Sequence, residues 1–458
     1  MIADNSSRRG NSKPTRPKAG KPRAPSGIAA REVAVRLLAA VLFDGRSFDE
    51  ALAKESLKSS MEPRDRALAR LIAGTVLRRL GELEAVLTNF LQKPLPDRQG
   101  LLWPILLSGA AQLLFLQTPP HAAVSIAVEQ TRRDRKARRF DRLVNALLRR
   151  VAREGTEVLQ ECDALRLNVP EWLFARWIET YGEDQARRIG EASLTEASLD
   201  ISVKADPEKW AERLGGSLLP MGSVRLKAGG RIEDLSGYAD GAWWVQDAAA
   251  ALPVKLLGSV AGKAVADLCA APGGKTVQLA ASGAQVTAVD LSAARLARVR
   301  ANLERLRLNA DLVEADATTW APGRTFDAVL LDAPCTATGT IRRHPDILRL
   351  KRPEDLATLG RLQTSLLKHA LNLVAPGGTL VYCTCSLEPE EGALQIAQLL
   401  ARAENFMRVP IAGGESGIAS SWITPEGDLR TLPCHLPHQD PQLSGVDGFY
   451  AVRLMRRA

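Results

Sequence analysis

Two cysteines of this sequence stand where a thiol can take part in chemistry. Cys335 ends the segment Asp332-Ala-Pro-Cys335, and Cys385 follows an apolar run in Thr384-Cys-Ser386. A thiolate is a strong nucleophile that replaces one difficult step by easier ones through a covalent intermediate. In one such reaction a thiolate adds to carbon 6 of a cytosine and makes carbon 5 enamine-like, so that carbon 5 attacks a sulfonium methyl group. Loss of the carbon 5 proton and elimination of the thiol then release the product.

Charged residues near these segments would support such a reaction. Cations beside a cysteine favour its thiolate form, and Lys275, Arg342 and Arg343 are candidates by their nearness in the sequence. The carboxyl group of Asp332 is the candidate to hydrogen-bond ring nitrogen 3 and the exocyclic amine of the base. Cys383 alternates with Cys385 along the apolar run, so we expect Cys383 in the core.

A glycine-rich turn predicts the site of the methyl donor. Residues 265–276 show the pattern of a strand, a turn and a helix, and the turn comprises Cys269, Ala270, Ala271, Pro272, Gly273, Gly274 and Lys275. In a doubly wound α/β sheet, ligands bind outside the carboxyl ends of the strands. A phosphate-binding loop would need glycine at position 269, and the dinucleotide motif G-x-G-x-x-G is absent. We therefore expect a ligand without a polyphosphate, such as S-adenosylmethionine.

Acidic residues end three successive strand patterns after this turn. Asp290 follows Asp267 by 23 residues, a position from which an acid accepts hydrogen bonds from ribose hydroxyls. Asp316 is the candidate acceptor for the adenine amino group, and Asp332 ends the third strand pattern. One such acid could simply cap a strand. Three of them beside a glycine-rich turn favour a nucleoside site.

The second half of the chain alternates strand and helix patterns, which is typical of a mostly parallel sheet with right-handed crossovers. The predicted strands are 264–268, 285–290, 311–315, 327–332, 378–384, 406–411 and 448–455. The predicted helices are 276–282, 292–306, 353–373 and 388–403. The last two strands are candidates for an antiparallel edge.

The first half divides into three parts. Residues 1–27 carry seven Lys and Arg against one Asp, a net charge of +6 that leaves +3 for the other 431 residues. Residues 28–153 show apolar positions at helical spacing and predict six or seven helices. Within them, residues 131–142 hold seven basic and two acidic residues, which suit either phosphates or a solvated helix face. Residues 154–240 predict a small α+β linker domain.

Composition narrows the class of protein. The chain has 458 residues, of which 45% are hydrophobic and 25% charged, as in globular proteins of several domains. Neither a signal peptide nor an apolar run long enough to span a membrane is evident. The six cysteines are scattered, so we expect a reducing, cytoplasmic compartment, no disulfide framework and no metal.

The helical half resembles a known RNA-binding domain. Pro119-Pro-His-Ala-Ala-Val124 and Leu143-Val-Asn-Ala-Leu-Leu-Arg-Arg150 are similar to segments of the NusB-type helical domain. The likeness is to the version fused to bacterial ribosomal RNA cytosine methyltransferases. This resemblance implies that residues 28–153 bind RNA.

The second half, from about residue 236 to 458, resembles the RNA cytosine-C5 methyltransferase family, and its bacterial small-subunit ribosomal RNA members most of all. Residues 269–275 match the family's donor loop, residues 332–335 its fourth motif, and residues 384–386 its sixth. Asp447-Gly-Phe-Tyr450 resembles the family's closing strand. The resemblance implies that Cys385 is the nucleophile and that Cys335 assists product release. The spacing of the cysteines alone leaves the two roles open.

The resemblance implies an α/β fold, in which a Rossmann-like class I methyltransferase domain (residues 241–458) follows the NusB-like domain and the linker. It further implies that S-adenosylmethionine is the methyl donor. The implied partner is small-subunit (16S) ribosomal RNA, free or in an assembly intermediate. The protein is expected to be a monomer that binds no membrane. Two alternatives stay open: a transfer RNA cytosine-C5 methyltransferase, and a non-catalytic RNA-binding assembly factor. His344 contacts RNA or serves only the structure of its loop.

Overall fold

The computed structural model describes residues 27–58, 62–96 and 99–458, so the predicted basic tail lies outside the described part except for Gly27. The described residues of the predicted helical domain contain no strand. Their seven α-helices are α1 (Ile28–Leu42), α2 (Phe48–Lys58), α3 (Pro63–Arg78), α4 (Leu80–Phe90), α5 (Leu102–Leu114), α6 (Pro120–Arg133) and α7 (Asp141–Gln160). The all-helical prediction is confirmed, and α7 runs past the predicted boundary at residue 153.

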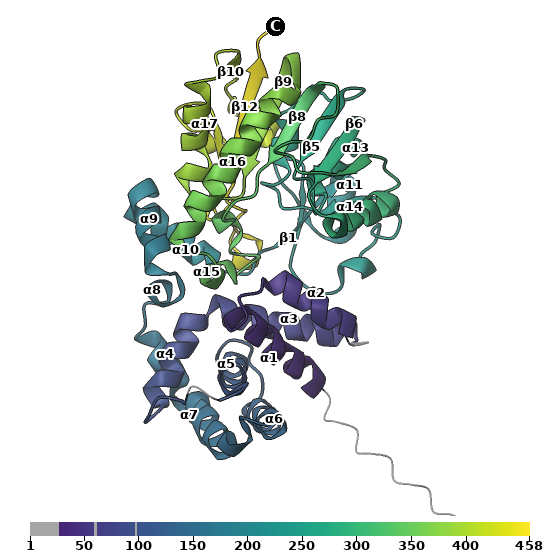
Figure 1. Cartoon of the computed structure of the whole chain (residues 1–458). Coiled ribbons are helices and arrows are strands. Elements are labelled where there is room, and N and C mark those ends of the chain that lie inside the picture. The colour runs from purple at the N-terminus through teal and green to yellow at the C-terminus, as the bar shows by residue number, and fades with distance from the viewer. Residues whose placement is uncertain (1–26, 59–61, 97–98) are drawn as a thin grey trace, which may run out of the picture.

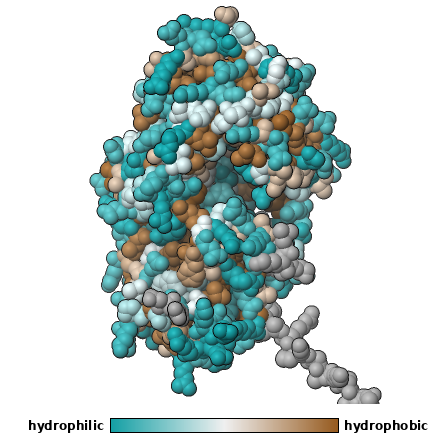
Figure 2. Space-filling model, viewed as in Figure 1, coloured by the Kyte–Doolittle hydropathy of each residue, from teal (hydrophilic) through white to brown (hydrophobic). Residues whose placement is uncertain are grey.

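These helices share one apolar core, because their apolar residues recur at three- and four-residue spacing. In α7, Val144, Leu147, Leu148 and Val151 are at most 4% exposed. Arg149 and Arg150, on the other face of the same helix, are exposed. In the view of Figure 1 the helical domain forms the lower end of the molecule, and Figure 2 shows that hydrophilic residues dominate this end.

The linker region consists of two separately packed pieces. Its elements are α8 (Ala164–Asn168), α9 (Glu171–Tyr181), α10 (Glu183–Ser193), β1 (Leu199–Val203), α11 (Pro207–Leu214), β2 (Ser217–Leu218), β3 (Val224–Leu226) and β4 (Trp243–Val245). The four strands form an antiparallel sheet in the order β2-β3-β1-β4. The three helices pack elsewhere: Phe174 and Trp177 of α9 join a cluster with Ile341 and Leu387 of the C-terminal domain.

The position of β4 differs from the predicted domain ranges, which placed this strand in the methyltransferase domain (residues 241–458). Trp243 pairs with Val203 and is buried in the core of the small sheet. Trp244 points to the opposite side and packs on residues of the C-terminal domain. A boundary at residue 240 therefore separates β4 from the sheet to which it belongs.

The C-terminal domain is built on a mixed sheet. Its strands are β5 (Ala264–Leu268), β6 (Gln285–Asp290), β7 (Asp311–Glu314), β8 (Phe326–Asp332), β9 (Val374–Thr384), β10 (Phe406–Arg408), β11 (Leu429–Arg430) and β12 (Tyr450–Arg456). The order is β10-β12-β9-β8-β5-β6-β7, and β11 pairs with β12. Strands β5 to β9 are parallel to one another, while β12 pairs antiparallel with both of its neighbours, β9 and β10. The predicted parallel sheet with an antiparallel edge is confirmed.

Helices cover both faces of this sheet. They are α12 (Leu252–Lys255), α13 (Gly274–Ala281), α14 (Ala293–Leu306), α15 (Ile347–Leu350), α16 (Pro353–Leu373) and α17 (Ala393–Leu400). Apolar residues of α16 and α17 bury one face, and those of α12 and α13 bury the other. The predicted helix over 388–403 is shorter, because a 3-10 turn at Pro389–Glu391 precedes α17 and turns Glu391 inward.

The helical domain is docked on a loop of the C-terminal domain. The Arg78 guanidinium donates to the Arg342 carbonyl at 2.9 Å, and the Phe48 amide donates to the Asp346 carboxylate at 2.9 Å. The imidazole Nδ1 of His344 lies 3.4 Å from the Asp49 carboxylate. Figure 2 shows a hollow in the surface where the two domains meet. Across the described ranges, no helix is long and apolar enough to cross a membrane.

Candidate active site

The two cysteines come together at the carboxyl edge of the sheet. Strands β8 and β9 are parallel neighbours, so the segments that follow them leave the same edge side by side. The Sγ atoms of Cys335 and Cys385 lie 3.5 Å apart. Their hydrogen bond, together with burial, raises the pKa of Cys335 well above its ordinary value. Cys383 is fully buried in the sheet, as expected from its alternation with Cys385.

Lysine 275 is aimed at this cysteine pair from the donor loop. Its Nζ lies 2.7 Å from the Asp332 carboxylate and 5.1 Å from the centre of the Phe449 ring. Burial lowers the pKa of Lys275, but the charge and hydrogen bond of Asp332, together with Cys383 and more weakly Cys385, raise this pKa above its ordinary value overall. A cation, a carboxylate and a thiol thus share one small region.

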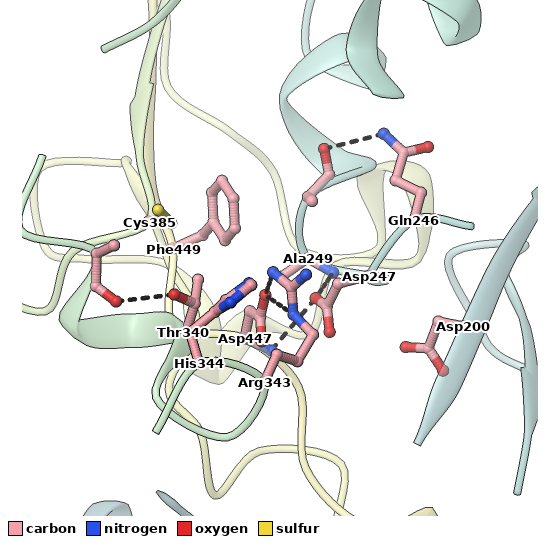
Figure 3. A network of polar contacts seen from close by, with 12 residues as sticks. Asp200, Gln246, Asp247, Ala249, Thr340, Arg343, His344, Cys385, Asp447 and Phe449 are labelled. Carbon is pink, nitrogen blue, oxygen red and sulfur yellow. Dashed lines mark hydrogen bonds and ion pairs between the residues drawn. The ribbon is translucent and has the colours of Figure 1, made fainter. Parts of the chain in front are cut away.

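A second ion pair lies beside the same cysteine. Arg343 donates from Nε to the Asp447 carboxylate at 2.8 Å, and its second nitrogen binds the same oxygen. Burial lowers the pKa of Arg343, whereas Asp447 and, more weakly, Cys385 raise it to a higher value overall. Figure 3 shows this pair with Phe449 and Cys385 in one network.

Of the three cations predicted to act on the thiol, two are in place. Lys275 and Arg343 interact electrostatically with Cys385. Arg342 is 1% exposed and donates instead to the Ser444 carbonyl, while its own carbonyl binds Arg78. The sequence neighbourhood could not separate Arg342 from Arg343, because adjacent residues of this turn point in different directions.

The donor loop takes the shape expected of a glycine-rich turn. Cys269 and Gly273 have positive φ values of 62° and 104°, and α13 begins directly after Gly273. A Cβ on Gly273 would lie 3.0 Å from the Val299 side chain, so the loop runs close to α14. The Ala271 amide donates to Asp290 at 3.1 Å, and the Arg295 guanidinium donates to the Ala271 carbonyl at 2.6 Å. The loop is therefore fixed from two sides.

The other residues of the donor loop have different surroundings. Ala270 donates its amide to the Val289 carbonyl at 3.0 Å, and Ala271 and Pro272 are joined by a cis peptide bond. A Cβ on Gly274 would make only an ordinary contact, with the nearest atom, on the Gln246 side chain, 3.8 Å away. Burial raises the pKa of Cys269 to about 12, so this thiol stays protonated.

The predicted acids all reach the same sheet edge, with different surroundings. Asp290 is 2% exposed, and its two oxygens accept hydrogen bonds from the Ala271 and Ser292 amides. Asp316 accepts from the amide and hydroxyl of Thr318 at 2.8 and 2.7 Å, which lowers its pKa. Each carboxylate keeps lone pairs for a ligand, since an ionised carboxylate has about four acceptor sites.

Asp267, at the end of β5, is a site residue to which the sequence analysis gave no role. It is fully buried, and its Oδ2 accepts from the Thr276 hydroxyl at 2.6 Å. Its Oδ1 is buried without a hydrogen-bond partner, and burial raises the pKa of Asp267 to about 7. Its place at a strand end, like that of the three predicted acids, was the signal that could have identified it.

Other site residues could not be identified from the sequence. Asp447 was assigned only to the closing strand, yet it binds Arg343, and its amide donates to Asp247 at 3.2 Å. Glu391 is fully buried and accepts hydrogen bonds from Thr336, the residue after Cys335. No short-range pattern marks such pairs.

The residues at this edge fit S-adenosylmethionine. The unpartnered Oδ1 of Asp267 is an acceptor suited to an ammonium group or a water bound to it. Leu291, directly after Asp290, is 72% exposed and offers an apolar surface for a flat base. Among the described residues, no group of three or more His, Cys, Asp and Glu side chains could hold a metal ion.

Comparisons with known proteins match the two main parts of the chain to known families. Residues 254–455 match the family described as 16S rRNA methyltransferase RsmB/F, and residues 28–153 match the NusB family. The ribosomal RNA small subunit methyltransferase B of Vibrio cholerae is 38% identical over 390 residues, covering 81% of this chain and 89% of that protein. Its counterpart in Xylella fastidiosa is 38% identical over 446 residues, covering 94% and 98%.

The fold itself is also known. The crystal structure of the protein PH0851 has a TM-score of 0.71 and a sequence identity of 24%, and the match covers 96% of this chain and 100% of that chain. At this identity the likeness establishes a common fold. It extends over the helical domain, the linker and the sheet domain together.

Proposed function

Because the chain belongs to the 16S rRNA methyltransferase RsmB/F family, we propose that it methylates carbon 5 of a cytosine in small-subunit ribosomal RNA through a covalent adduct with Cys385. S-adenosylmethionine, bound between the donor loop and Asp290, supplies the methyl group. The observation that carries the proposal is the 3.5 Å contact of the Cys335 and Cys385 sulfurs beside the Lys275–Asp332 pair. Two thiols and an ion pair at the mouth of a donor loop suit covalent catalysis.

The nucleophilic step follows from the charges around Cys385. Its thiolate adds to carbon 6, and the ring electrons gather at carbon 5. Carbon 5 would then bond the methyl carbon as the bond from that carbon to the donor's sulfonium sulfur breaks and leaves its electron pair on the sulfur. Lys275 and Arg343 stabilise the negative sulfur, and their own partners, Asp332 and Asp447, keep both cations in position. Asp332, 31% exposed at its side chain, can hydrogen-bond the exocyclic amine of the base.

The release step assigns a role to Cys335. The carbon 5 proton passes to a water molecule, its electron pair restores the double bond between carbons 5 and 6, and the carbon 6–sulfur bond breaks. The electron pair of that bond returns to the Cys385 sulfur as negative charge. Cys335, held as a thiol, donates a hydrogen bond to the departing sulfur. Hydrogen bonds to charged groups are stronger than neutral ones.

The helical domain supplies the binding of RNA in this proposal. Arg135, Lys136, Arg138, Arg139 and Arg142 are exposed, and none of the five forms an ion pair within the described part of the chain. Arg132 and Arg133 are instead paired with Asp141, Glu32 and Glu129. Unpaired cations gain most from phosphates, because contact with RNA releases condensed counterions. A base splayed out of an RNA loop could then enter the hollow between the domains.

The test is the transfer of labelled methyl groups from S-adenosylmethionine to small-subunit ribosomal RNA and to transfer RNA. Wild type, Cys385→Ala and Cys335→Ala are compared. We expect label in ribosomal RNA, no transfer by Cys385→Ala, and a covalent protein–RNA adduct with Cys335→Ala. Label only in transfer RNA would change the substrate and keep the chemistry. Cytosine methylation by Cys385→Ala would overturn the assignment of the nucleophile, and binding of RNA without any transfer would favour an assembly factor.

A further inference from the structure

Glu391 is a buried acid with an unusually complete set of hydrogen bonds. It lies in the 3-10 turn before α17 and is fully buried. Its two carboxylate oxygens accept from the Thr336 amide at 2.9 and 3.1 Å, and one of them accepts from the Thr336 hydroxyl. The Gln363 side-chain amide donates to the other oxygen at 3.0 Å. A buried charge is tolerated only where donors satisfy it in this way.

These contacts fix the backbone on both sides of Cys335. Glu391 holds Thr336, which follows the cysteine. Gln363, on α16, also donates to the Pro334 carbonyl at 2.8 Å, just before the cysteine. The loop that carries the Cys335 thiol therefore cannot shift without breaking contacts to Glu391 or to Gln363.

Glu391 is also hydrogen-bonded to β9, the strand that ends directly before Cys385. The carbonyl oxygen of Glu391 accepts from the Tyr382 hydroxyl at 2.8 Å and from the Thr384 hydroxyl at 3.2 Å. Tyr382 and Thr384 belong to β9, and Thr384 immediately precedes Cys385. Glu391 thus joins the two cysteine-bearing segments, whose sulfurs lie 3.5 Å apart.

The negative charge of Glu391, like its hydrogen bonds, supports the role of Cys335 as a hydrogen-bond donor. After the hydrogen bond to Cys385 and burial, the negative charge of Glu391 contributes to the raised pKa of Cys335. A thiol at position 335 is the form that can donate a hydrogen bond to sulfur. The acid therefore favours the protonation state that the release step requires.

We propose that Glu391 is a positioning residue for Cys335: it holds the Cys335 thiol against the Cys385 sulfur, so that the covalent adduct with RNA is released after methylation. The inference rests on the proposed function. It assigns to Glu391 no contact with RNA or with the methyl donor, and it predicts that loss of Glu391 slows release and spares methyl transfer.

The experiment compares Glu391→Gln with Glu390→Gln, the same substitution at the neighbouring residue. Glu390 has a side chain that is 43% exposed and pairs with Arg176, away from the cysteines. Each variant is given labelled S-adenosylmethionine and small-subunit ribosomal RNA. Methyl transfer in the first turnover and the covalent adduct that survives denaturation are measured, with thermal unfolding as a check of folding.

We expect Glu391→Gln to release product about tenfold more slowly, as for the loss of one strong hydrogen bond, and to accumulate adduct as Cys335→Ala does. The rate of the first methyl transfer stays within about threefold of wild type, and Glu390→Gln behaves as wild type. In the double variant Cys335→Ala/Glu391→Gln, release is no slower than with Cys335→Ala alone, because both changes remove one interaction.

The outcomes separate the inference from the proposed function. If Cys335→Ala accumulates adduct and Glu391→Gln does not, the positioning role of Glu391 is wrong while the proposed function stands. If neither Cys335→Ala nor Glu391→Gln accumulates adduct, the release role of Cys335 fails. If Glu391→Gln does not fold, Thr336→Val decides: it removes the hydroxyl donor to Glu391 and, with it, the contact of that hydroxyl to the Ser386 hydroxyl. Normal release with this variant would overturn the inference.

Discussion

The Sγ atoms of Cys335 and Cys385 lie 3.5 Å apart, although the residues are 50 positions apart in the chain. The contact follows from the parallel pairing of β8 and β9, which places both segments at one sheet edge. At this distance one thiol can donate a hydrogen bond to the other sulfur, and only one of the two can ionise easily. In the proposed function, Cys385 is the nucleophile of this pair and Cys335 is the hydrogen-bond donor.

The donor role of Cys335 predicts a difference between two substitutions. Cys335→Ser keeps a hydroxyl donor, whereas Cys335→Ala removes the donor. We expect Cys335→Ala to slow product release by about 10- to 100-fold, because a hydrogen bond to a charged group contributes about 1.5–3 kcal/mol. Cys335→Ser should retain most of the release rate and accumulate less adduct on a denaturing gel. Equal accumulation by both variants would show that release needs a thiol and not merely a donor.

Much of the sheet and its edge follows from sequence pattern. Alternating strands and helices dictate a parallel sheet, and a parallel sheet collects the ends of its strands at one edge. Asp290, Asp332 and Cys335 were therefore predictable as neighbours, before any side-chain contact was known. The order β9-β8-β5-β6-β7 was not predicted, because the right-handed crossover rule fixes the hand of each connection and not the point where the order reverses.

The contacts between loops were not predictable in this way. Arg343 and Asp447 are 104 residues apart, and Glu391 reaches Thr336 across 55 residues. Such pairs depend on how irregular segments pack, for which the sequence has no periodic signal. The apolar periodicity of α17 also extended the predicted helix backwards over Glu391, and so concealed that this acid points inward from a separate turn.

Gly339, which contacts the backbone of Cys385, gives a second prediction. The Gly339 amide donates to the Cys385 carbonyl at 2.9 Å, and a Cβ at position 339 would lie 2.0 Å from the Gly448 carbonyl oxygen. We expect Gly339→Ala to lower the free energy of unfolding by about 1–3 kcal/mol, as other overpacked sites do. Methyl transfer should fall further than stability, because the displaced backbone carries Cys385.

Gly360→Ala is the matched control for this change. Gly360 lies inside α16, and the nearest atom to its hypothetical Cβ is the flexible end of Gln395 at 3.4 Å. Alanine is favoured over glycine in a helix by about 1 kcal/mol, so this variant should be at least as stable as wild type. Urea unfolding and labelled methyl transfer measure both variants. Full activity of Gly339→Ala would contradict the role of this contact.

The buried acid Asp267 predicts a dependence of stability on pH. Burial raises its pKa in the folded chain to about 7, above the value of about 3.9 for an exposed aspartate. The folded state therefore binds the proton more tightly than the unfolded state. Its contribution to stability is fully present below pH 4 and is lost as the pH rises through 7.

Asp267→Asn removes this titration. Relative to wild type, the variant should gain up to about 4 kcal/mol in the free energy of unfolding between pH 4 and pH 7, at about 1.4 kcal/mol per pH unit, and nothing more above pH 8. Urea unfolding of both proteins at each pH measures the gap. Asp240→Asn, the same substitution at an exposed position, provides the control. A constant gap for Asp267→Asn would mean that Asp267 titrates as an ordinary acid.

The unpaired cations of the helical domain predict a salt-dependent loss of RNA affinity. Arg138→Glu/Arg139→Glu reverses two exposed charges that have no ion-pair partner among the described residues. Arg361→Glu/Lys368→Glu makes the same change in net charge on the outer side of α16. If residues 135–142 bind phosphates, only the first variant should raise the Michaelis constant for ribosomal RNA, by about tenfold or more near physiological salt.

The dependence of RNA affinity on salt distinguishes direct contact with phosphates from a general effect of the protein's net charge. Each lost phosphate contact lowers the slope of log affinity against log salt by about 1, so the difference from wild type should be largest in dilute salt and shrink as salt is added. The maximal rate should stay unchanged, because these arginines lie on the helical domain and not at the cysteine pair. If both double variants lose affinity equally, RNA senses only the net charge of the protein, and the basic segment is not the RNA contact.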